Sequence, residues 1–533
     1  MKKQDYFLLF ISGLIIGSIM LYLRPYTGYM DADYYFATAR EIYSGHGFVQ
    51  SFLWNYLDDP AGLPHPSFTY WMPLSALVSA FGSWVFQQDG LLFARLPFVL
   101  IFGFVPVLTG FFGYRLSSSR VDGWLAGLLS LFCGFYLRYI TEPDSFSILM
   151  ILGPAIILLL CVEKDRWKRW IIPIVIGILS GLIHLTRADG LIWLAAAGMG
   201  LFILIFKNDQ IHRKNTDAGS RPIREAIIQI ALLCLGYLLV TFPWYLRNLE
   251  IYHSVFPPGN FRTALITEYD QMFSYPATLI TISGWWNQGL SKILTNMISA
   301  IGTNLTTALV IQGNIIMLPF MIIGIVKRRE KTDAKMTLVV WVILFLAMSL
   351  IFPFAGKRGG YLHSIAALQP LLWVYSIYGL RIVAAKAAQW RNWNEQTALK
   401  FFSILFLCVS MVVSGYVVIG DRIDQVHSQS ANLWSDYSKV DEYIRQSGSE
   451  GQYSVMVNDP PAYQIATRQN AYILPYGPIE TMVRTADDFK VDYLVLDKSH
   501  TQYFNDLYGN PGSTDGLVYL GKIMDYHIYR FVK

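Results

Sequence analysis

Long apolar runs separated by short polar stretches dominate the chain. A membrane-spanning helix needs about 20 mostly apolar residues, and eleven runs approach that length. They lie near residues 6–23, 91–114, 122–138, 145–162, 170–186, 189–206, 226–246, 306–326, 336–354, 361–380 and 400–419. We therefore predict a polytopic α-helical membrane protein with about eleven transmembrane helices.

The loop between the first two runs, residues 24–90, contains an apolar piece of its own. This piece, residues 70–84, is short for a span, and prolines precede it. We predict a helix that lies at the membrane interface, because a span here would invert the sidedness of every later loop. A short tilted span is the alternative.

The pattern changes after residue 420, where the apolar runs shorten to strand length. Candidate strands lie near 453–457, 471–474, 493–496 and 527–531, with helix-like segments near 432–447 and 479–487. We predict two parts: a transmembrane domain over 1–420 and a small soluble α/β domain over 421–533. This small domain either caps the outer face or helps to hold an acceptor.

Composition agrees with a membrane protein, since 54% of the 533 residues are apolar and only 15% are charged. The distribution of Lys and Arg among the short loops sets the orientation. Placing the N-terminus in the cytoplasm puts the following basic residues inside: Arg115, Arg120, Lys164, Arg166, Lys168, Arg169, Arg213, Lys214, Arg221, Arg224, Lys327, Arg328, Arg329, Lys331, Arg381, Lys386 and Arg391. The 24–90 loop and the C-terminal domain then face outward, and the net charge of +5 needs no nucleic-acid partner.

Two carboxylates, Asp31 and Asp33, open the 24–90 loop just beyond the first apolar run. Nothing structural requires acidic residues there, and ionisable groups beside a span often serve chemistry. Tyr35, Ala39-Arg40-Glu41 and His65-Pro66 follow in the same loop.

These residues resemble the first outer loop of the GT-C membrane glycosyltransferases, particularly the branch similar to glycosyltransferase family 39, with the protein O-mannosyltransferases and the lipid A aminoarabinose transferase. In that family an acidic residue opens the loop, followed by a Tyr and an Ala-Arg-Glu helix. Asp31, Tyr35 and Ala39-Arg40-Glu41 match those positions. Many relatives have Asp-Glu where this chain has Asp-Ala-Asp, which leaves open whether Asp31 or Asp33 acts. Many also have Lys-Pro-Pro where this chain has His65-Pro66-Ser67.

The resemblance continues in order along residues 1–420. Asp144, beside Glu142 in the next outer loop, matches the second functional acid of the family. The other matching segments are Arg95-Leu96-Pro97, Thr186-Arg187-Ala188-Asp189-Gly190, Pro243-Trp244-Tyr245-Leu246-Arg247-Asn248 and Lys357-Arg358-Gly359-Gly360-Tyr361-Leu362-His363. The resemblance implies a GT-C fold and transfer of a sugar from a polyprenyl-phosphate donor.

The chemistry suggests a role for each kind of residue. A carboxylate at the membrane surface can deprotonate an acceptor hydroxyl. We therefore predict Asp31, Asp33 and Asp144 as the catalytic carboxylates, with Asp31 as the general base. Cationic side chains suit the lipid phosphate, and Arg binds it with two parallel hydrogen bonds. The predicted phosphate-binding residues are Arg187, Arg247, Lys357, Arg358 and His363, and the predicted pocket residues are Tyr35, His65 and Glu142.

Structural roles remain alternatives at several of these positions. Asp31 and Asp144 can be helix caps, Asp33 can be structural, and each Arg can extend to the interface. Metal-spaced His/Cys clusters are absent from the sequence, so no metal site is assigned, although the acidic residues could gather Mg²⁺ or Mn²⁺.

The sequence therefore predicts an inverting membrane glycosyltransferase at the extracytoplasmic face, with a polyprenyl-phosphate sugar donor and a protein, lipid or glycan acceptor. One alternative is glycan transfer like that of an oligosaccharyltransferase; Trp285-Trp286-Asn287 is similar to the acceptor motif of those enzymes but lacks its Asp, and an interfacial aromatic belt explains it better. The other is a transporter or flippase for a lipid-linked sugar, for which we find no internal repeat.

Overall fold

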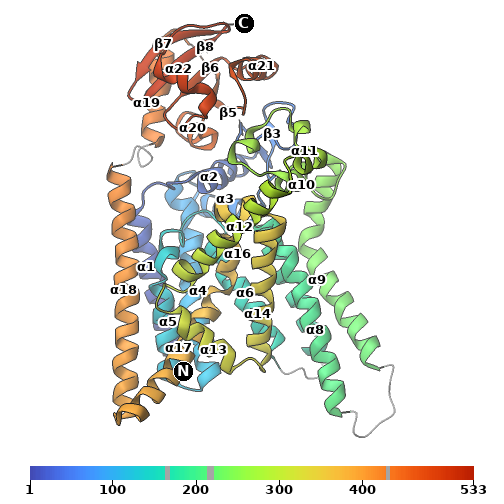
Figure 1. Ribbon diagram of the computed structural model, residues 1–533, viewed down its shortest axis with the longest axis vertical. Coiled ribbons are helices and arrows are strands. Elements are labelled where there is room, and N and C mark those ends of the chain that lie inside the picture. Colours follow the sequence, from blue (N-terminus) through green and yellow to red (C-terminus); the bar gives the residue numbers. More distant parts are fainter. Residues whose placement is uncertain (163–167, 213–220, 428–432, 450, 533) are drawn as a thin grey trace.

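A computed structural model describes residues 1–162, 168–212, 221–427, 433–449 and 451–532. A bundle of long helices forms the lower part and a mixed α/β layer the upper part (Figure 1). The N-terminus lies at the lower end and the C-terminus at the upper end (Figure 1).

Nine helical segments among the described residues are long and apolar enough to cross a membrane. The principal bundle helices are α1 (Lys3–Leu23), α4 (Leu91–Ser117), α5 (Arg120–Leu131), α6 (Phe146–Leu160), α7 (Lys168–Thr186), α8 (Leu191–His212), α9 (Arg221–Tyr252), α12 (Leu290–Thr307), α13 (Leu318–Lys327), α14 (Thr332–Leu346), α17 (Gln369–Arg391) and α18 (Glu395–His427). The chain is thus a multi-pass membrane protein, as the apolar runs predict.

The predicted span over 306–326 differs from the structure. The helix there begins earlier, at Leu290, continues through a π-helical segment (Ala308–Gln312), and stops before α13. Asn314 and Ile315 adopt positive φ angles of 43° and 58°, which a right-handed helix cannot accommodate. The span over 122–138 is likewise split, since α5 ends at Leu131 and a 3₁₀ helix (Gly134–Arg138) follows.

The first outer loop folds into two helices and three very short strands. These are α2 (Met30–Tyr43), α3 (Leu74–Phe86), β1 (Val49–Gln50), β2 (Phe52–Leu53) and β3 (His65–Pro66). The helix predicted over 70–84 is α3, and it packs against α2 and α4. Between α9 and α12 the chain forms the short helices α10 (Pro258–Arg262) and α11 (Ile282–Asn287).

The C-terminal layer contains the four predicted strands and both predicted helices. Its elements are α19 (Leu433–Gln446), β4 (Ser454–Val457), α20 (Pro460–Thr467), β5 (Asn470–Ile473), α21 (Ile479–Phe489), β6 (Tyr493–Leu496), α22 (Asn505–Gly509), β7 (Leu517–Ile523) and β8 (Tyr526–Phe531). Strand β7 and helices α20 and α22 were not predicted from the sequence.

One sheet joins this layer to the first outer loop. Its strand order is β2-β5-β4-β6-β8-β7, parallel from β2 to β6 and antiparallel beyond. The pairing of β2 with β5 sets Phe52 opposite Ala471. A single apolar core accordingly contains side chains of α2, the first outer loop and the C-terminal layer.

Candidate functional site

Three predicted residues converge where the helical bundle meets the upper layer: Asp31, Asp144 and His363. Asp31 lies in the first turn of α2, Asp144 immediately precedes Ser145 at the start of α6, and His363 belongs to the short helix α16 (Tyr361–Ile365). His363 Nε2 is 3.9 Å from Asp31 Oδ2, and its Nδ1 is 3.5 Å from Asp144 Oδ1. We call these three residues the acidic–histidine cluster.

Asp144 is held rigidly within the cluster. Its Oδ1 accepts a hydrogen bond from the Ser145 backbone N–H at 2.5 Å, and its Oδ2 accepts one from the Tyr29 hydroxyl at 2.9 Å. His363 Nδ1 also lies 3.1 Å from Ser145 Oγ, and the imidazole packs on Phe146 at a centroid distance of 4.2 Å. These contacts leave His363 Nε2 facing Asp31.

The two carboxyl groups of the cluster have opposite pKa shifts. Burial raises the pKa of Asp31 to about 6, although the charge of His363 opposes the shift. Burial also acts on Asp144, but His363 and the hydrogen bonds from Ser145 and Tyr29 outweigh it and hold the pKa of Asp144 below its ordinary value. Asp144 therefore stays ionised, whereas Asp31 can exchange a proton near neutral pH.

Arg187 supplies positive charge beside the cluster. Its Nε donates to Asp189 Oδ1 at 2.9 Å, and its Nη2 lies 3.4 Å from the Gly360 carbonyl oxygen. Its charge also acts on the carboxyl group of Asp31. Arg187 is thus anchored at the edge of the cluster and can face an anion there.

Lys357 and Arg358 lie in a distorted π-helical segment, Gly356–Gly360, just before α16. Gly359 has a φ of 106°, a conformation that favours glycine, and it allows the chain to turn between Arg358 and His363. Arg358 lies over the ring of Tyr269 at 4.1 Å, and Lys357 Nζ donates to Asn296 at 3.0 Å. The late basic loop thus adjoins the cluster through His363.

Arg247 is engaged with the first outer loop. Its Nη2 donates to the carbonyl oxygens of Phe48 at 3.1 Å and Ser67 at 2.8 Å, and its guanidinium lies 4.6 Å from the Trp244 ring centroid. These contacts fix the loop onto α9. They give Arg247 a structural role whether or not it also meets a ligand.

His65 and Glu142, both predicted in the pocket, are engaged with other side chains. His65 Nε2 lies 2.9 Å from Asp58 Oδ2. Glu142 is 1% exposed, and its Oε1 lies 2.8 Å from Arg95 Nη2 and 3.3 Å from Arg24 Nε. The Glu142 carboxylate therefore joins the end of α1 to α4 beneath the cluster.

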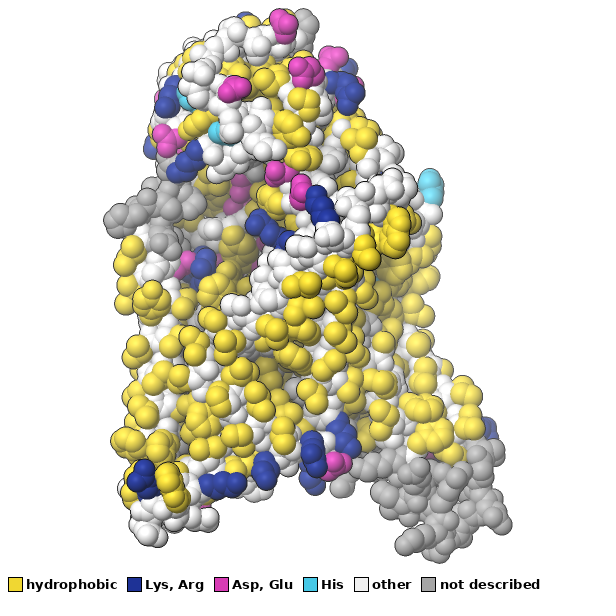
Figure 2. Space-filling model, in the orientation of Figure 1, with side chains coloured by type: hydrophobic (Ala, Val, Ile, Leu, Met, Phe, Trp, Pro, Cys, Tyr) yellow, Lys and Arg dark blue, Asp and Glu magenta, His cyan; other side chains and the backbone are white. Residues whose placement is uncertain are grey.

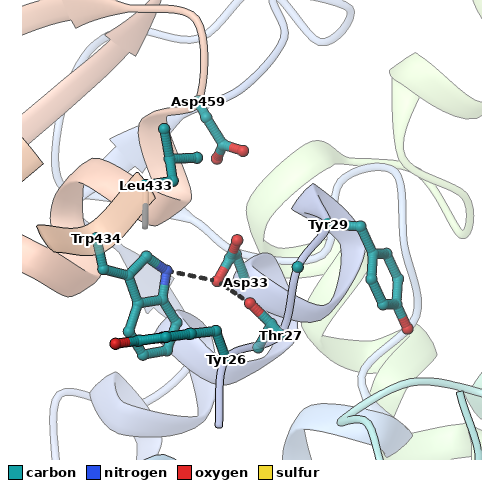
Figure 3. Close-up of a pocket in the computed structure, with 8 residues that line it drawn as sticks. Tyr26, Thr27, Tyr29, Asp33, Leu433, Trp434 and Asp459 are labelled. Carbon is teal, nitrogen blue, oxygen red and sulfur yellow. Dashed lines mark hydrogen bonds between the residues drawn. The ribbon is translucent and has the colours of Figure 1, made fainter. Parts of the chain in front are cut away.

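Tyr35 and Asp33 belong to α2, the same helix as Asp31. Tyr35 is buried in α2, and its ring is 6.1 Å from that of Trp71. Asp33 points toward Trp434 of the C-terminal layer, whose Nε1 donates a hydrogen bond to its Oδ1 at 3.0 Å (Figure 3). The structure thus separates Asp31, which the sequence favours as the base, from Asp33.

Three residues near the site escaped the sequence analysis: Tyr29, Trp434 and Asp459. Tyr29 directly precedes the acidic motif and could have been noticed as a hydrogen-bond donor. Trp434 and Asp459 lie far along the chain, and no local pattern links them to Asp33.

Comparison with solved structures finds proteins of similar architecture. The chain is similar to ArnT from Cupriavidus metallidurans in the apo state, with a TM-score of 0.53 and 14% identity over 99% of this chain and 98% of the other. The same enzyme bound to undecaprenyl phosphate gives a TM-score of 0.52 and 14% identity over 100% of this chain and 99% of that one. An Archaeoglobus fulgidus oligosaccharyltransferase, tethered to an acceptor peptide, gives a TM-score of 0.53 and 13% identity over 93% of this chain and 69% of that one.

Sequence comparison adds nothing to this picture. No family profile matches the chain, and no curated protein is similar enough in sequence to match it. The structural likenesses establish the fold.

Proposed function

We propose that this chain, which has the fold of the GT-C membrane glycosyltransferases, transfers a sugar from a polyprenyl-phosphate donor to an acceptor hydroxyl. The observation that carries the proposal is the acidic–histidine cluster with Arg187 beside it. One carboxylate that can take up a proton lies there next to a cation that can hold a phosphate.

The proposed reaction is an in-line displacement. The acceptor oxygen loses its proton to Asp31 as it attacks the anomeric carbon, and the bond from that carbon to the phosphate oxygen breaks. The lipid phosphate leaves with the bonding electron pair, so the configuration at the anomeric carbon inverts. Arg187, with Lys357 and Arg358, would stabilise the leaving phosphate, and Asp144 would keep His363 oriented.

The structural relatives support this substrate class. One ArnT structure contains undecaprenyl phosphate, and the oligosaccharyltransferase was solved with an acceptor peptide. A lipid phosphate is therefore known to bind a protein of this fold, and we extend that chemistry to this chain.

We further propose that the cluster faces the extracytoplasmic side. Lys and Arg side chains gather at the lower end of the molecule, below a band of hydrophobic side chains (Figure 2). Cytoplasmic loops carry the excess of Lys and Arg in membrane proteins. Of the basic residues used for this prediction, Lys164, Arg166, Arg213 and Lys214 lie outside the described residues.

Incubation of the purified protein with radiolabelled short-chain polyprenyl-phosphoryl sugars tests the proposal. A transferase should cleave the glycosyl bond and release the lipid phosphate, whereas a transporter would leave it intact. Turnover only of donors with a pyrophosphate carrier and a preassembled glycan would favour the oligosaccharyltransferase alternative.

The rate of transfer should depend on pH through Asp31. The base acts in its ionised form, and its pKa is about 6, so activity should rise as the pH increases through 6. At pH 5 we expect about one tenth of the plateau rate. A pH profile of donor turnover at saturating donor measures this, and a profile flat from pH 5 to 7.5 would contradict the assignment.

A divalent cation also fits the cluster. Asp31, Asp144 and His363 each offer one ligand atom, all within 4.8 Å of one another, and two carboxylates suit Mn²⁺. An oligosaccharyltransferase of this fold was solved with Zn and sulfate. When bound, the cation would offset the charge of the carboxylates beside an incoming phosphate.

Binding of Mn²⁺ should therefore depend on His363. We expect electron paramagnetic resonance to detect one Mn²⁺ per chain in the wild-type protein and none in His363→Ala. His46→Ala is the matched control, because His46 pairs with Glu41 outside the cluster. Equal Mn²⁺ binding by both variants would rule out this site.

A further inference from the structure

A groove lies between the segment that joins α9 to α12 and the C-terminal layer, beside α11 and α21 (Figure 1). Its volume is about 400 Å³, within the 300–1,000 Å³ usual for sites that bind small molecules. Residues 265–288 form one wall, and residues 476–484 with Tyr503 form the other. The Tyr476 backbone N–H donates to the Phe273 carbonyl oxygen at 2.9 Å, which joins the two walls.

Aromatic rings line both walls of this groove. Trp285 lies on the first wall, and Tyr476 and Tyr503 lie on the second, where their rings meet edge to face with centroids 5.4 Å apart. The two neighbouring tryptophans differ, since Trp285 lines the groove and is half-buried whereas Trp286 is 64% exposed. Aromatic faces can cover the C–H faces of a sugar ring and leave its hydroxyl groups free to form hydrogen bonds.

Polar side chains with unused hydrogen-bond donors also line the groove. Gln271 Oε1 accepts from the Thr267 backbone N–H at 2.9 Å, and Gln288 Oε1 accepts from Thr267 Oγ1 at 2.7 Å. Both amides are thus held by their oxygens, and neither amide nitrogen has an acceptor among the described residues. The Arg484 side chain likewise forms no hydrogen bond or ion pair within the described part of the chain. Amide and guanidinium donors suit the hydroxyl and ring oxygens of sugars.

The composition of the walls disfavours other kinds of ligand. None of the described residues that line the groove is Asp or Glu, so it offers no carboxylate to a metal ion or an amine. None of them belongs to a β-strand either, so a peptide could not bind by extending a sheet. Aromatic rings combined with neutral amides and hydroxyl groups fit a carbohydrate instead.

Hydrogen bonds connect the groove to the late basic loop. Thr267, which holds both glutamine side chains of the groove, accepts at its carbonyl oxygen from Asn296 Nδ2 at 3.2 Å. Asn296 Oδ1 in turn accepts from Lys357 Nζ at 3.0 Å. Two residues therefore join the groove to a side chain that we propose meets the donor phosphate.

We infer that this groove binds an oligosaccharide and holds it as the acceptor of the transfer. The sugar rings would pack on Trp285 and Tyr503, while the amides and Arg484 donate to their hydroxyl groups. The nucleophile of the proposed displacement is then a hydroxyl group of a glycan. Binding in the groove is independent of the proposed function, whereas the role as acceptor rests on it.

Binding of trisaccharides to the full-length protein tests the inference without requiring turnover. The probes are trisaccharides of glucose, mannose and N-acetylglucosamine, measured by ligand-observed NMR in a detergent that has no sugar headgroup. At least one trisaccharide should bind about tenfold more tightly than its monosaccharide, because the groove has room for more than one ring. Absence of binding by all three, or affinities equal to those of the monosaccharides, would overturn the inference.

Trp285→Ala should weaken trisaccharide binding about tenfold, and so should Tyr503→Ala on the opposite wall. Trp286→Ala is the matched control, because it removes the neighbouring exposed ring, which does not line the groove, and it should bind normally. Equal binding by folded Trp285→Ala and Trp286→Ala would overturn the site. If Trp285→Ala does not fold, Tyr503→Ala decides in its place.

Asp31→Asn separates this inference from the proposed function, since it should lose transfer yet bind the trisaccharide as the wild type does. At saturating donor, Trp285→Ala should act mainly on the KM for the trisaccharide and raise it about tenfold. An unchanged KM would overturn the role as acceptor. A wild-type protein that binds the trisaccharide but cleaves no donor would refute the proposed function and the acceptor role, but not the groove as a binding site.

Discussion

Asp31→Asn should reduce sugar transfer by about 10²–10⁴-fold while donor binding persists. The substitution preserves shape but removes the group that accepts the proton, and Asp144 cannot replace it because Ser145, Tyr29 and His363 already hold that carboxylate. Single-turnover transfer and separate donor binding in detergent measure the two effects.

Asp89→Asn is a suitable control for Asp31→Asn. Asp89 lies between α3 and α4, is half exposed, and pairs with Arg468. Removal of its charge should leave transfer within about twofold, since surface ion pairs contribute little. Equal activity of folded Asp31→Asn and wild type would refute the assignment of the base.

Glu142→Ala should cause the largest loss of stability. Glu142 is buried with Arg95 and Arg24. Arg24 would still pair with Asp421, but Arg95 would lose this carboxylate partner, and removal of one partner of a buried ion pair costs about 3–5 kcal/mol. Unfolding in detergent, followed by tryptophan fluorescence, measures the change in the free energy of unfolding.

Glu268→Ala provides the comparison for Glu142→Ala. Glu268 pairs with Lys292, and both side chains are exposed, so its loss should cost less than about 1 kcal/mol. If the two variants were equally stable, the buried ion pair would not be important for joining α1 to α4.

The sequence predicted most of the membrane helices and four of the five C-terminal strands that the structure describes, because hydrophobic periodicity specifies them. It failed around 306–326, where the apolar run hides two residues with positive φ that break the helix. Gln312-Gly313-Asn314 is the local signal for this break, since Gly and Asn favour turns, but it is short and lies within a run that is otherwise apolar.

The candidate site could be predicted only in part, because local segments reveal residue types but not the distances between those residues. Asp31, Asp144 and His363 each belong to short segments that match a family pattern, so their residue types could be read locally. Their mutual distances depend on packing among helices far apart in the chain. Asp31 and Asp33 lie on different faces of α2 because they are two residues apart, but that Trp434 would meet Asp33 could not be read from the sequence.

The pairing of β2 with β5 imposes an order on biosynthesis. β2 leaves the ribosome early, yet its partner strand emerges only after the last membrane helix, so the sheet cannot be completed until insertion of the bundle has finished. The edge of β2 stays unpaired in the meantime. A fragment with only the C-terminal layer would leave the edge of β5 open permanently and tend to associate through it.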